Sequence, residues 1–372
     1  MKILHLLYES RGDYYGIGGV GERAYQIYGF LKKRHGITIL CKKYPGANNS
    51  TIEGIRHIYA GAESKSLTRT LLSYAYHAAG YVKQHGHEYD IIIEEFSPAT
   101  PTFLHSYTKT PVILQIQGYT GRLYFNKYNP LFATVLCLLE QFRPRAYRNF
   151  IFIDEHTRSR FPLSGNKPTA IIPNGVSDEL LDMPCQEGEY VLYLGRIDIY
   201  GKGLDILLAA YSEFARSVPG MGLVIAGDGK EMRKFRAMVD DLPEDIRKNI
   251  KLTGWLSGRT KQEILSNASF LVLPSRHEVQ GIAVLEAMAA GKAVVASDLP
   301  ELSYILGSNA GICFKSGDPM SLARAITDMA ESTERSQMGA NGRAWVKDLP
   351  WNKVAEKFEA FLHTVAGRRS PK

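Results

Sequence analysis

The chain has 372 residues, more than one hydrophobic core usually supports, so we expect two domains. Its hydrophobic content of 45% and charged content of 22% are typical of a soluble globular protein, and its longest apolar run, residues 131–139, is too short to span a bilayer. The net charge of +7 favours acidic partners such as phosphorylated donors or anionic lipids. Nucleic acid is not expected, because the chain has no basic tail and no nucleic-acid-binding motif.

The first residues and the cysteines both indicate a cytoplasmic protein. Residues 1–8 lack the long apolar core of a signal peptide and predict a first strand instead. The cysteines are scattered, with no Cys-x-x-Cys pair, and most have apolar neighbours, which is typical of buried free thiols in a reducing compartment. They are Cys41, Cys137, Cys185 and Cys313.

The first half of the chain alternates strand and helix patterns, which predicts a parallel, doubly wound α/β sheet. Strands are expected at residues 2–7, 37–41, 55–60, 90–93, 111–116 and 150–153, and helices at about 21–33, 67–85 and 129–148, the last broken near Pro144. The loop at residues 8–20 contains Gly12, Gly16, Gly18 and Gly19. Such a loop either brings backbone N–H groups close to a phosphate or is a flexible connector.

The same rhythm restarts after the turn at residues 173–176, near which we place a domain boundary. Strands are expected at residues 190–194, 222–226, 250–253, 270–273 and 293–296, and helices at about 204–216, 231–239, 281–290, 321–330, 334–347 and 351–366. The predicted domains are residues 1–175 and 176–350, and the final helix, residues 351–366, is expected to pack back on the first domain.

The second half is organised around residues 269–297, a strand–loop–helix–strand unit with two carboxylates, Glu278 before the helix and Glu286 inside it. Between them, the N–H groups of Gly281 and Ile282 begin the helix, where the helix dipole favours an anion. The loop lies at the carboxyl end of a strand, where open α/β sheets bind ligands. A phosphate seat with two acceptors for hydroxyl groups suits a sugar joined to a nucleotide. The alternative is an ordinary helix with a solvated Glu286.

Two cations lie just past an earlier strand of the same half. Arg196 follows Gly195 directly after the strand, and Lys202 precedes Gly203 at the start of a helix. An arginine can bind two phosphate oxygens at once and a lysine acts as a mobile point charge, so together they could clamp a diphosphate. Alternatively they are solvated loop cations, one of which pairs with Asp198.

Taken together, these residues resemble the retaining nucleotide-sugar glycosyltransferases of family 4, whose GT-B fold has two facing Rossmann-like, doubly wound domains. The resemblance is strong from about residue 190 to 317 and loose over the first domain. Its matching pieces are Gly18-Gly19, Pro173-Asn174-Gly175-Val176, Gly195-Arg196 with Lys202-Gly203, Gly227-Asp228-Gly229, Gly254, Pro274-Ser275, Glu278, Glu286-Ala287-Met288, Pro300-Glu301 and Trp351.

The resemblance implies a role for each part of the site. Arg196 and Lys202 would hold the donor diphosphate, and with Glu278 they form the expected catalytic set. Glu278 would bind donor-sugar hydroxyls, close to the amides of Gly281 and Ile282, and Glu286 the ribose hydroxyls. Gly18 and Gly19 would approach the phosphate from the first domain, and Gly254 and Leu256 would contact the base. Negative charge builds on the departing nucleoside diphosphate, and these cations and the helix N-terminus stabilise it. No Asp-x-Asp motif lies in a suitable loop, so no metal cofactor is expected.

The acceptor side departs from the family pattern. Gln117 stands where many relatives carry a histidine; it can hydrogen-bond a hydroxyl group but cannot shuttle a proton. Tyr119 and Arg122 are the other expected contacts of an acceptor, which would be a glycan or a lipid-linked molecule; the donor would be UDP- or GDP-linked. Residues 131–139, followed by Arg143, Arg145 and Arg148, either rest on an anionic membrane at its inner face or form a core helix with a solvated basic end.

Three other functions remain open. Glu278 and Glu286 could be the acid/base pair of a glycosidase, although a helix N-terminus and two cations suit a phosphate better than they would raise a carboxyl pKa. A non-catalytic nucleotide-sugar-binding protein would have lost its chemistry together with the histidine. A phosphorylase or epimerase could use the same fold.

Overall fold

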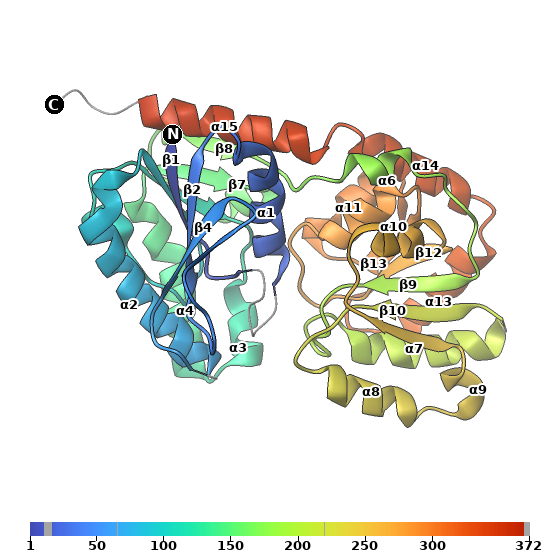
Figure 1. Ribbon diagram of the computed structural model, residues 1–372. Helices are drawn as coiled ribbons and strands as arrows, with labels where there is room; N and C mark the ends of the chain where they lie inside the picture. Colours follow the sequence, from blue (N-terminus) through green and yellow to red (C-terminus); the bar gives the residue numbers. More distant parts are fainter. Residues whose placement is uncertain (11–16, 65, 219, 368–372) are drawn as a thin grey trace. The chain divides into compact units, whose positions relative to one another are not determined.

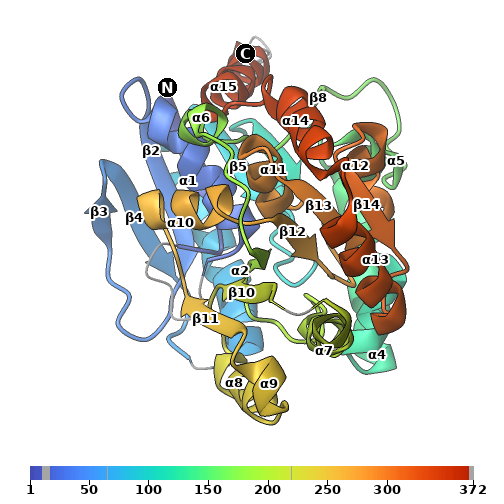
Figure 2. The same cartoon turned by 90° about the vertical axis from the view of Figure 1, so that its right-hand side faces the viewer.

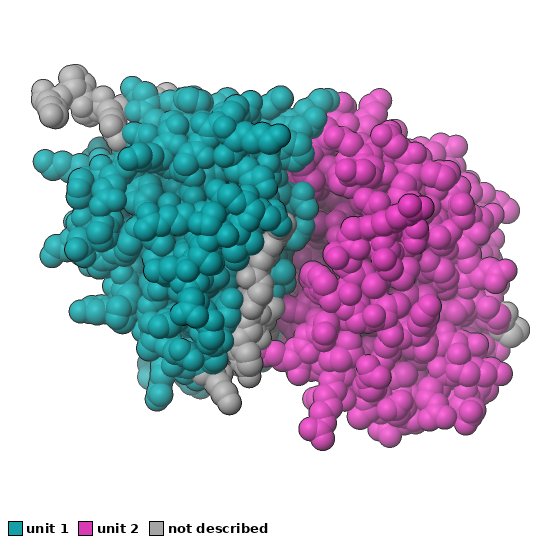
Figure 3. All heavy atoms as spheres, in the orientation of Figure 1, with its two compact units in different colours: residues 1–174, 352–372 teal, residues 175–351 magenta. Residues whose placement is uncertain are grey.

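The structure is a computed structural model that describes residues 1–10, 17–64, 66–218 and 220–367. The chain divides into two compact units, which Figures 1 and 3 show. Unit 1 contains residues 1–174 together with the chain from residue 352 onward, and unit 2 contains residues 175–351. Gly12 and Gly16 of the predicted glycine-rich loop lie outside the described residues.

Unit 1 is built on one sheet, whose described strands follow the order β3-β4-β2-β1-β5-β6-β7-β8. All neighbours are parallel except β3, which pairs with β4 in the antiparallel direction. The central strands are apolar and buried over almost their whole length, as expected where helices cover both faces of a parallel sheet. The strands are β1 (Lys2–Leu6), β2 (Gly36–Lys42), β3 (Ser50–Ile52), β4 (Ile55–Ala60), β5 (Ile91–Glu95), β6 (Val112–Ile116), β7 (Asn149–Phe152) and β8 (Thr169–Ile171).

The helices of unit 1 connect these strands, and most of their buried residues are apolar. They are α1 (Gly19–Leu31), α2 (Leu67–His85), α3 (Tyr124–Lys127), α4 (Pro130–Phe142), α5 (Glu155–Ser159) and α15 (Trp351–Gly367), with 3-10 turns η1 (Gly86–Glu88), η2 (Leu104–Ser106), η3 (Gly121–Leu123) and η4 (Arg143–Ala146). The final helix packs on unit 1: the ring of Phe358 in α15 lies edge-on against Tyr28 of α1, with 6.3 Å between the ring centroids.

Helix α4 differs from one of the two sequence expectations, a core helix with a solvated basic end. Its apolar run is not a plain core helix, because Leu131, Val135, Leu138 and Phe142 are exposed along one face. Arg143 does not belong to a solvated basic end either: it is buried and pairs with Glu94 of β5. A buried charge needs such a partner, and the partner comes from a strand 49 residues earlier in the sequence. No helix among the described residues is long and apolar enough to cross a membrane.

The cysteines also differ from the expectation of buried thiols. Only Cys41 is buried, Cys137 and Cys313 are half-buried, and Cys185 is exposed. All four are free thiols. Burial as expected from apolar neighbours is therefore complete only for Cys41, since burial depends on what packs against the element from elsewhere in the chain.

Unit 2 contains a second, fully parallel sheet, with the described strands in the order β11-β10-β9-β12-β13-β14. The strands are β9 (Tyr190–Leu194), β10 (Gly222–Ala226), β11 (Ile250–Gly254), β12 (Phe270–Leu273), β13 (Ala293–Ser297) and β14 (Gly311–Phe314). The helices and 3-10 turn are α6 (Asp178–Asp182), α7 (Leu204–Ser217), α8 (Met232–Asp240), α9 (Glu244–Arg247), α10 (Gly258–Ser266), α11 (Ile282–Ala289), η5 (Pro300–Leu302), α12 (Tyr304–Gly307), α13 (Pro319–Glu331) and α14 (Arg335–Val346).

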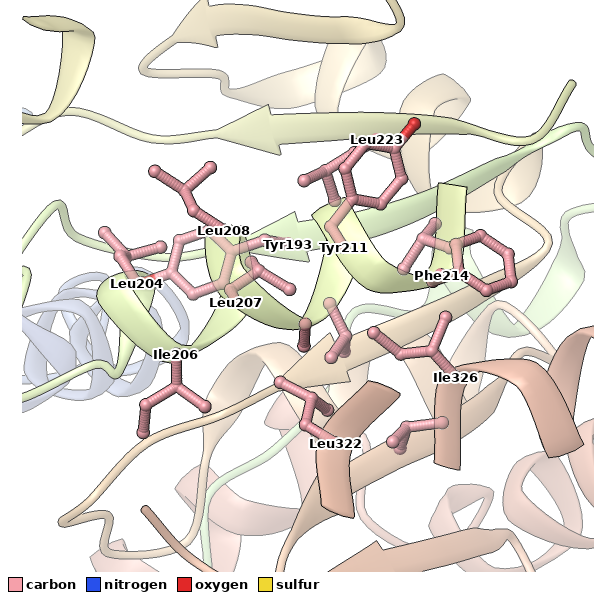
Figure 4. Close-up of a cluster of buried hydrophobic side chains, with 14 of the residues drawn as sticks. Tyr193, Leu204, Ile206, Leu207, Leu208, Tyr211, Phe214, Leu223, Leu322 and Ile326 are labelled. Carbon is pink, nitrogen blue, oxygen red and sulfur yellow. The ribbon is translucent and has the colours of Figure 1, made fainter. Parts of the chain in front are cut away.

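Alternate residues of the central strand β9 reach opposite faces of this sheet. Val191 and Tyr193 join a core with α7, α8 and α13, part of which Figure 4 shows around Leu207 and Tyr211. Leu192 joins a second core with α11 on the other face. Helices α7 and α13 pack against each other, as Figure 2 shows. A sheet covered on both faces by helices confirms the predicted doubly wound α/β class.

Candidate functional site

The loops that follow β9 and β12 form the candidate site in unit 2. In sequence order the strands of this sheet run 3-2-1-4-5-6, so the connections leave in opposite directions from the neighbouring strands β9 and β12. This is a topological switch point, where open α/β sheets bind ligands beyond the carboxyl ends of the strands. The predicted cations follow β9, and the predicted carboxylate Glu278 follows β12, so the fold brings the two stretches together.

A glycine allows these two loops to touch. Gly203 precedes α7 with a positive φ of 65°, and a Cβ atom at this position would lie only 2.0 Å from the carbonyl oxygen of Pro274. Any other residue would push the loop after β12 away from the start of α7. The backbone N–H of Arg276 also donates to the carbonyl of Gly201, at 3.1 Å.

Arg276 joins the same two loops through its side chain. Its guanidinium donates to both carboxylate oxygens of Asp205 at 2.8 and 2.7 Å, and it lies over the ring of Tyr200, 4.4 Å from the centroid. The hydrogen bond to Asp205 raises the pKa of Arg276 further. A bidentate, stacked arginine holds its partners in one arrangement, so this contact fixes the two loops relative to each other. The sequence analysis missed this pair, because no motif links positions 205 and 276.

Lys202 and Glu278 form an ion pair inside the site, with 2.6 Å between Nζ and Oε2. Asp198, which was the alternative partner for a cation, instead accepts a hydrogen bond from the Gly201 N–H. Burial on its own would raise the pKa of Glu278. The charge of Lys202, with hydrogen bonds from Lys202 and the Val279 N–H, outweighs burial and holds this pKa below its usual value. Glu278 is therefore a fixed carboxylate and a hydrogen-bond acceptor.

Helix α11 begins directly after this carboxylate. Gly281 caps it with a positive φ of 67°, and Ile282 is its first residue and half-buried. The first N–H groups of a helix have no partner within the helix and carry its positive dipole end. The hydroxyl of Tyr304 donates to the carbonyl of Gln280 and holds the turn that precedes them.

Glu286, one turn into α11, is paired with a residue that the sequence analysis missed. Nζ of Lys261 in α10 lies 2.5 Å from Oε1 of Glu286, and both side chains are mostly buried. Helix α10 follows Gly254, the last residue of β11, and the half-buried Leu256. The partner of the predicted ribose contact thus lies on the helix that directly follows the predicted base contacts. Lys261 belongs to no motif, so the sequence gave no signal that it pairs with Glu286.

Arg196 differs from Lys202, Glu278 and Glu286, which are paired within the site. It is exposed, and its guanidinium makes no hydrogen bond or ion pair with any residue that the structure describes. Its carbonyl, in contrast, accepts a hydrogen bond from the hydroxyl of the buried Tyr193 at 2.8 Å, which fixes the backbone. The guanidinium can therefore bind an anion without first breaking a protein contact.

In unit 1, the predicted phosphate-binding loop is already occupied by a side chain of the protein. Oε2 of Glu9 accepts hydrogen bonds from the N–H groups of Gly18 and Gly21, both at 2.9 Å. Gly18 is the N-cap of α1 and Gly19 is its first residue, which is exposed. The start of α1 does bind a carboxylate, as a helix N-terminus should. The sequence analysis did not identify Glu9 as that carboxylate.

The predicted acceptor residues lie on the loop after β6. Gln117 is buried and donates to Glu95, whereas Tyr119 is half-buried against Phe161 and Arg122 is exposed. The buried Glu140 of α4 holds this loop by accepting hydrogen bonds from the N–H groups of residues 120 and 121. Burial raises the pKa of Glu140, although these bonds oppose the shift.

The family comparison agrees with the resemblance predicted from the sequence. Residues 185–345 match the family model described as glycosyl transferases group 1. Phosphatidyl-myo-inositol mannosyltransferase of Mycolicibacterium smegmatis is 32% identical over 208 residues, which cover 53% of this chain and 52% of that protein. The chain thus matches about half the length of this curated relative. The resemblance predicted from the sequence is confirmed over residues 185–345, the part of the chain that the family model matches.

Solved structures show the fold over the whole chain. Sucrose-phosphate synthase of Thermosynechococcus elongatus matches with a TM-score of 0.79 at 20% identity, covering 98% of this chain and 99% of that one. HepE of Anabaena, in complex with UDP and glucose, matches with a TM-score of 0.73 at 17% identity, covering 98% and 100%. The GT-B fold predicted from the sequence is confirmed.

Proposed function

Because unit 2 belongs to the glycosyl transferases group 1 family, we propose that this chain is a retaining glycosyltransferase. It transfers a sugar from a nucleoside-diphosphate donor to a hydroxyl group of an acceptor. The observation that carries the proposal is the switch point of unit 2, where Lys202, Glu278 and the start of α11 converge. These groups suit a sugar and a diphosphate that are bound side by side.

Positive charge at the switch point supports departure of the diphosphate. Negative charge grows on this leaving group in the transition state. Arg196 has an uncommitted guanidinium, Lys202 has an ammonium group 2.6 Å from Glu278, and α11 offers its N-terminal amides. In this proposal these groups stabilise the leaving group and no divalent metal is needed. The donor phosphate itself assists as base on the same face of the sugar.

The lowered pKa of Glu278 favours a glycosyltransferase over a glycosidase. A glycosidase pair needs one carboxyl group with a raised pKa to act as general acid. The pKa of Glu278 lies below its usual value, mainly because Lys202 opposes the effect of burial. An ionised carboxylate accepts hydrogen bonds from sugar hydroxyls, and we assign this role to Glu278.

The nucleoside part of the donor fits the other end of the site. We assign the ribose hydroxyls to Glu286, whose carboxylate Lys261 orients, and the base to the loop of Gly254 and Leu256. Trp255 in this loop is 56% exposed, so its indole can stack on a base. The complex of the structural neighbour HepE with UDP and glucose supports a UDP-linked donor; a GDP-linked donor is the alternative.

We further propose that the acceptor is a glycan or lipid-linked molecule, as in polysaccharide or glycolipid synthesis. The relative that acts on phosphatidyl-myo-inositol, to judge from its name, supports a lipid-linked acceptor. The contacts of the acceptor would be Gln117, Tyr119 and Arg122 in unit 1.

The exposed face of α4 supports contact with the inner face of an anionic membrane. Leu131, Val135, Leu138 and Phe142 recur at helical spacing, and the one charged residue of this helix, Glu140, is buried. Arg145 lies over the ring of Phe142, 4.6 Å from its centroid, which adds positive charge at the end of the stripe. Such a face can enter the interface of a bilayer without spanning it.

Vesicle flotation tests the membrane contact. The protein should float with anionic vesicles at low salt and be released by high salt, and Leu138→Glu should abolish flotation. Tyr76→Glu is the matched control, because Tyr76 is 79% exposed and lies on a different helix, α2. Equal flotation of both variants, or none by the unmodified protein, would reject the contact.

A donor screen tests the activity. Thermal shift with UDP-, GDP- and ADP-linked sugars should identify one donor, and the radiolabelled form of that donor should be slowly hydrolysed when no acceptor is present. A protein that binds the donor but releases no sugar would be a non-catalytic nucleotide-sugar-binding protein. Strict dependence on phosphate, or isomerisation of the sugar, would indicate a phosphorylase or an epimerase.

A further inference from the structure

A second cluster of titratable side chains lies in unit 1, and none of its members belongs to the candidate site. His35 follows α1 and its side chain is 4% exposed, whereas Glu359 and His363 belong to α15, with Glu359 16% exposed. Residues four positions apart in a helix lie on the same face, so α15 presents Glu359 and His363 together toward His35. The three side chains come from two segments that are distant in the sequence.

We propose that His35, Glu359 and His363 bind one divalent transition-metal ion, with Zn²⁺ as the best fit. Nε2 of His35 lies 2.5 Å from Oε1 of Glu359, and one ligand atom from each of the three residues lies within 4.8 Å of the others. Two imidazoles and one carboxylate are a ligand set that zinc accepts, with water in the fourth position. His363 is exposed, so its ring can turn to complete the site.

Binding of an ion requires the contact between Nε2 of His35 and Oε1 of Glu359 to open, because these atoms lie 2.5 Å apart. Nη2 of Arg34 donates to Oε2 of Glu359 at 2.7 Å and holds the carboxylate by its other oxygen. The amino group of Met1 lies 3.2 Å from Nδ1 of His35, so the other ring nitrogen faces Glu359. A donor at Nδ1 favours a proton on Nε2, which the ion must displace. The charge of Arg34 opposes a cation, so we expect weaker binding than at a closed four-ligand zinc site.

The expected consequence is structural. An ion held by His35 on one side and by two residues of α15 on the other would fasten the final helix to the body of unit 1. Because the ion binds only the folded arrangement, it would raise the unfolding temperature in proportion to its occupancy. These residues are separate from those assigned to the donor, so the inference does not depend on the proposed activity.

Metal titration of the full chain tests the site. After treatment with a chelator and its removal, the protein should bind one equivalent of Zn²⁺ by calorimetry. Co²⁺ should give the visible absorption of a tetrahedral site with nitrogen and oxygen ligands. Zn²⁺ should also raise the unfolding temperature, and EDTA should reverse this rise.

Substitutions locate the ion. His363→Ala and Glu359→Gln should each weaken Zn²⁺ binding at least tenfold. His77→Ala is the control and should not change the binding, because His77 is an exposed imidazole on α2 that hydrogen-bonds within its own helix. Unfolding temperatures in EDTA show whether each variant is folded, and His363, being exposed, should tolerate replacement. Absence of one-equivalent binding by the unmodified protein, or unchanged binding in folded His363→Ala, would overturn the proposal.

Discussion

The side-chain nitrogen of Gln117 lies 3.1 and 3.2 Å from the two carboxylate oxygens of Glu95. Nε2 of Gln117 donates to both oxygens, so Oε1 of the same amide points away from Glu95. Gln115 also donates to Glu95, and Nε2 of His5 lies 3.2 Å from it. In the proposed acceptor role, Oε1 of Gln117 would accept a hydrogen bond from a hydroxyl group of the substrate.

Replacement of this amide should affect the transfer reaction. We expect Gln117→Leu to lower kcat/KM about 5- to 10-fold, the effect of one neutral hydrogen bond. Gln115→Leu is the matched control, because it removes a similar hydrogen bond to Glu95. The Oε1 atom of Gln115 is buried without a partner among the described residues, so this side chain is not expected to contact a substrate. Equal kinetic losses in the two variants would assign Gln117 a purely structural role.

Arg196→Ala should weaken donor binding without changing stability. Its guanidinium makes no contact that the fold needs, and a charge-assisted hydrogen bond to phosphate contributes on the order of 10- to 100-fold in affinity. Calorimetry with the donor, alongside thermal unfolding, measures both quantities. Arg216→Ala serves as the control, since Arg216 is exposed and pairs with Glu213 on α7. Unchanged donor affinity would remove Arg196 from the proposed clamp.

Glu286→Ala and Lys261→Ala should both weaken donor binding. The first removes the acceptor of the ribose hydroxyls, and the second leaves that carboxylate without the cation that orients it. Because the two side chains act as one unit, the double variant should lose less affinity than the sum of the single losses. Arg259→Ala, which breaks an exposed pair with Glu263 on the same helix, should have no effect. Additive losses would show that the two residues act independently.

The pH dependence of stability should reveal the Lys202–Glu278 pair. The pKa of Glu278 is lowered in the folded protein, so the unfolded chain binds more protons as the pH falls. The stabilisation is fully present above the unfolded pKa of about 4.3, and it is lost as the pH falls through the lower, folded pKa. Glu278→Gln should lack this part of the acid transition in thermal unfolding at pH 3 to 6. The same acid slope in both proteins would contradict the pairing.

The sequence predicted those parts of the fold that depend on local pattern. The strand Phe270–Leu273, the helix that follows it and the strand Ala293–Ser297 were expected from apolar runs and a terminal glycine, and the structure contains them with small changes in their ends. The short strands β3, β8 and β14 were missed, and β8, like β3, has only three residues. The residues of β14 were not recognised as a strand.

Contacts between distant residues were beyond the reach of the sequence pattern. Lys261 reaches Glu286 across 25 positions, and Arg143 is buried because Glu94 meets it, although its basic neighbours favoured a solvated end. The motifs selected several charged residues of unit 2 as candidates but did not indicate what each one pairs with. Pairing depends on the order of strands in the sheet, which no spacing in the sequence encodes.

Glu9 shields the start of α1 from anions in solution. Its carboxylate is tethered beside the N–H groups of Gly18 and Gly21, so it competes with any incoming anion at a high local concentration. A second anion can reach these two amides only by displacing the carboxylate, so we expect anions from solution to bind weakly there.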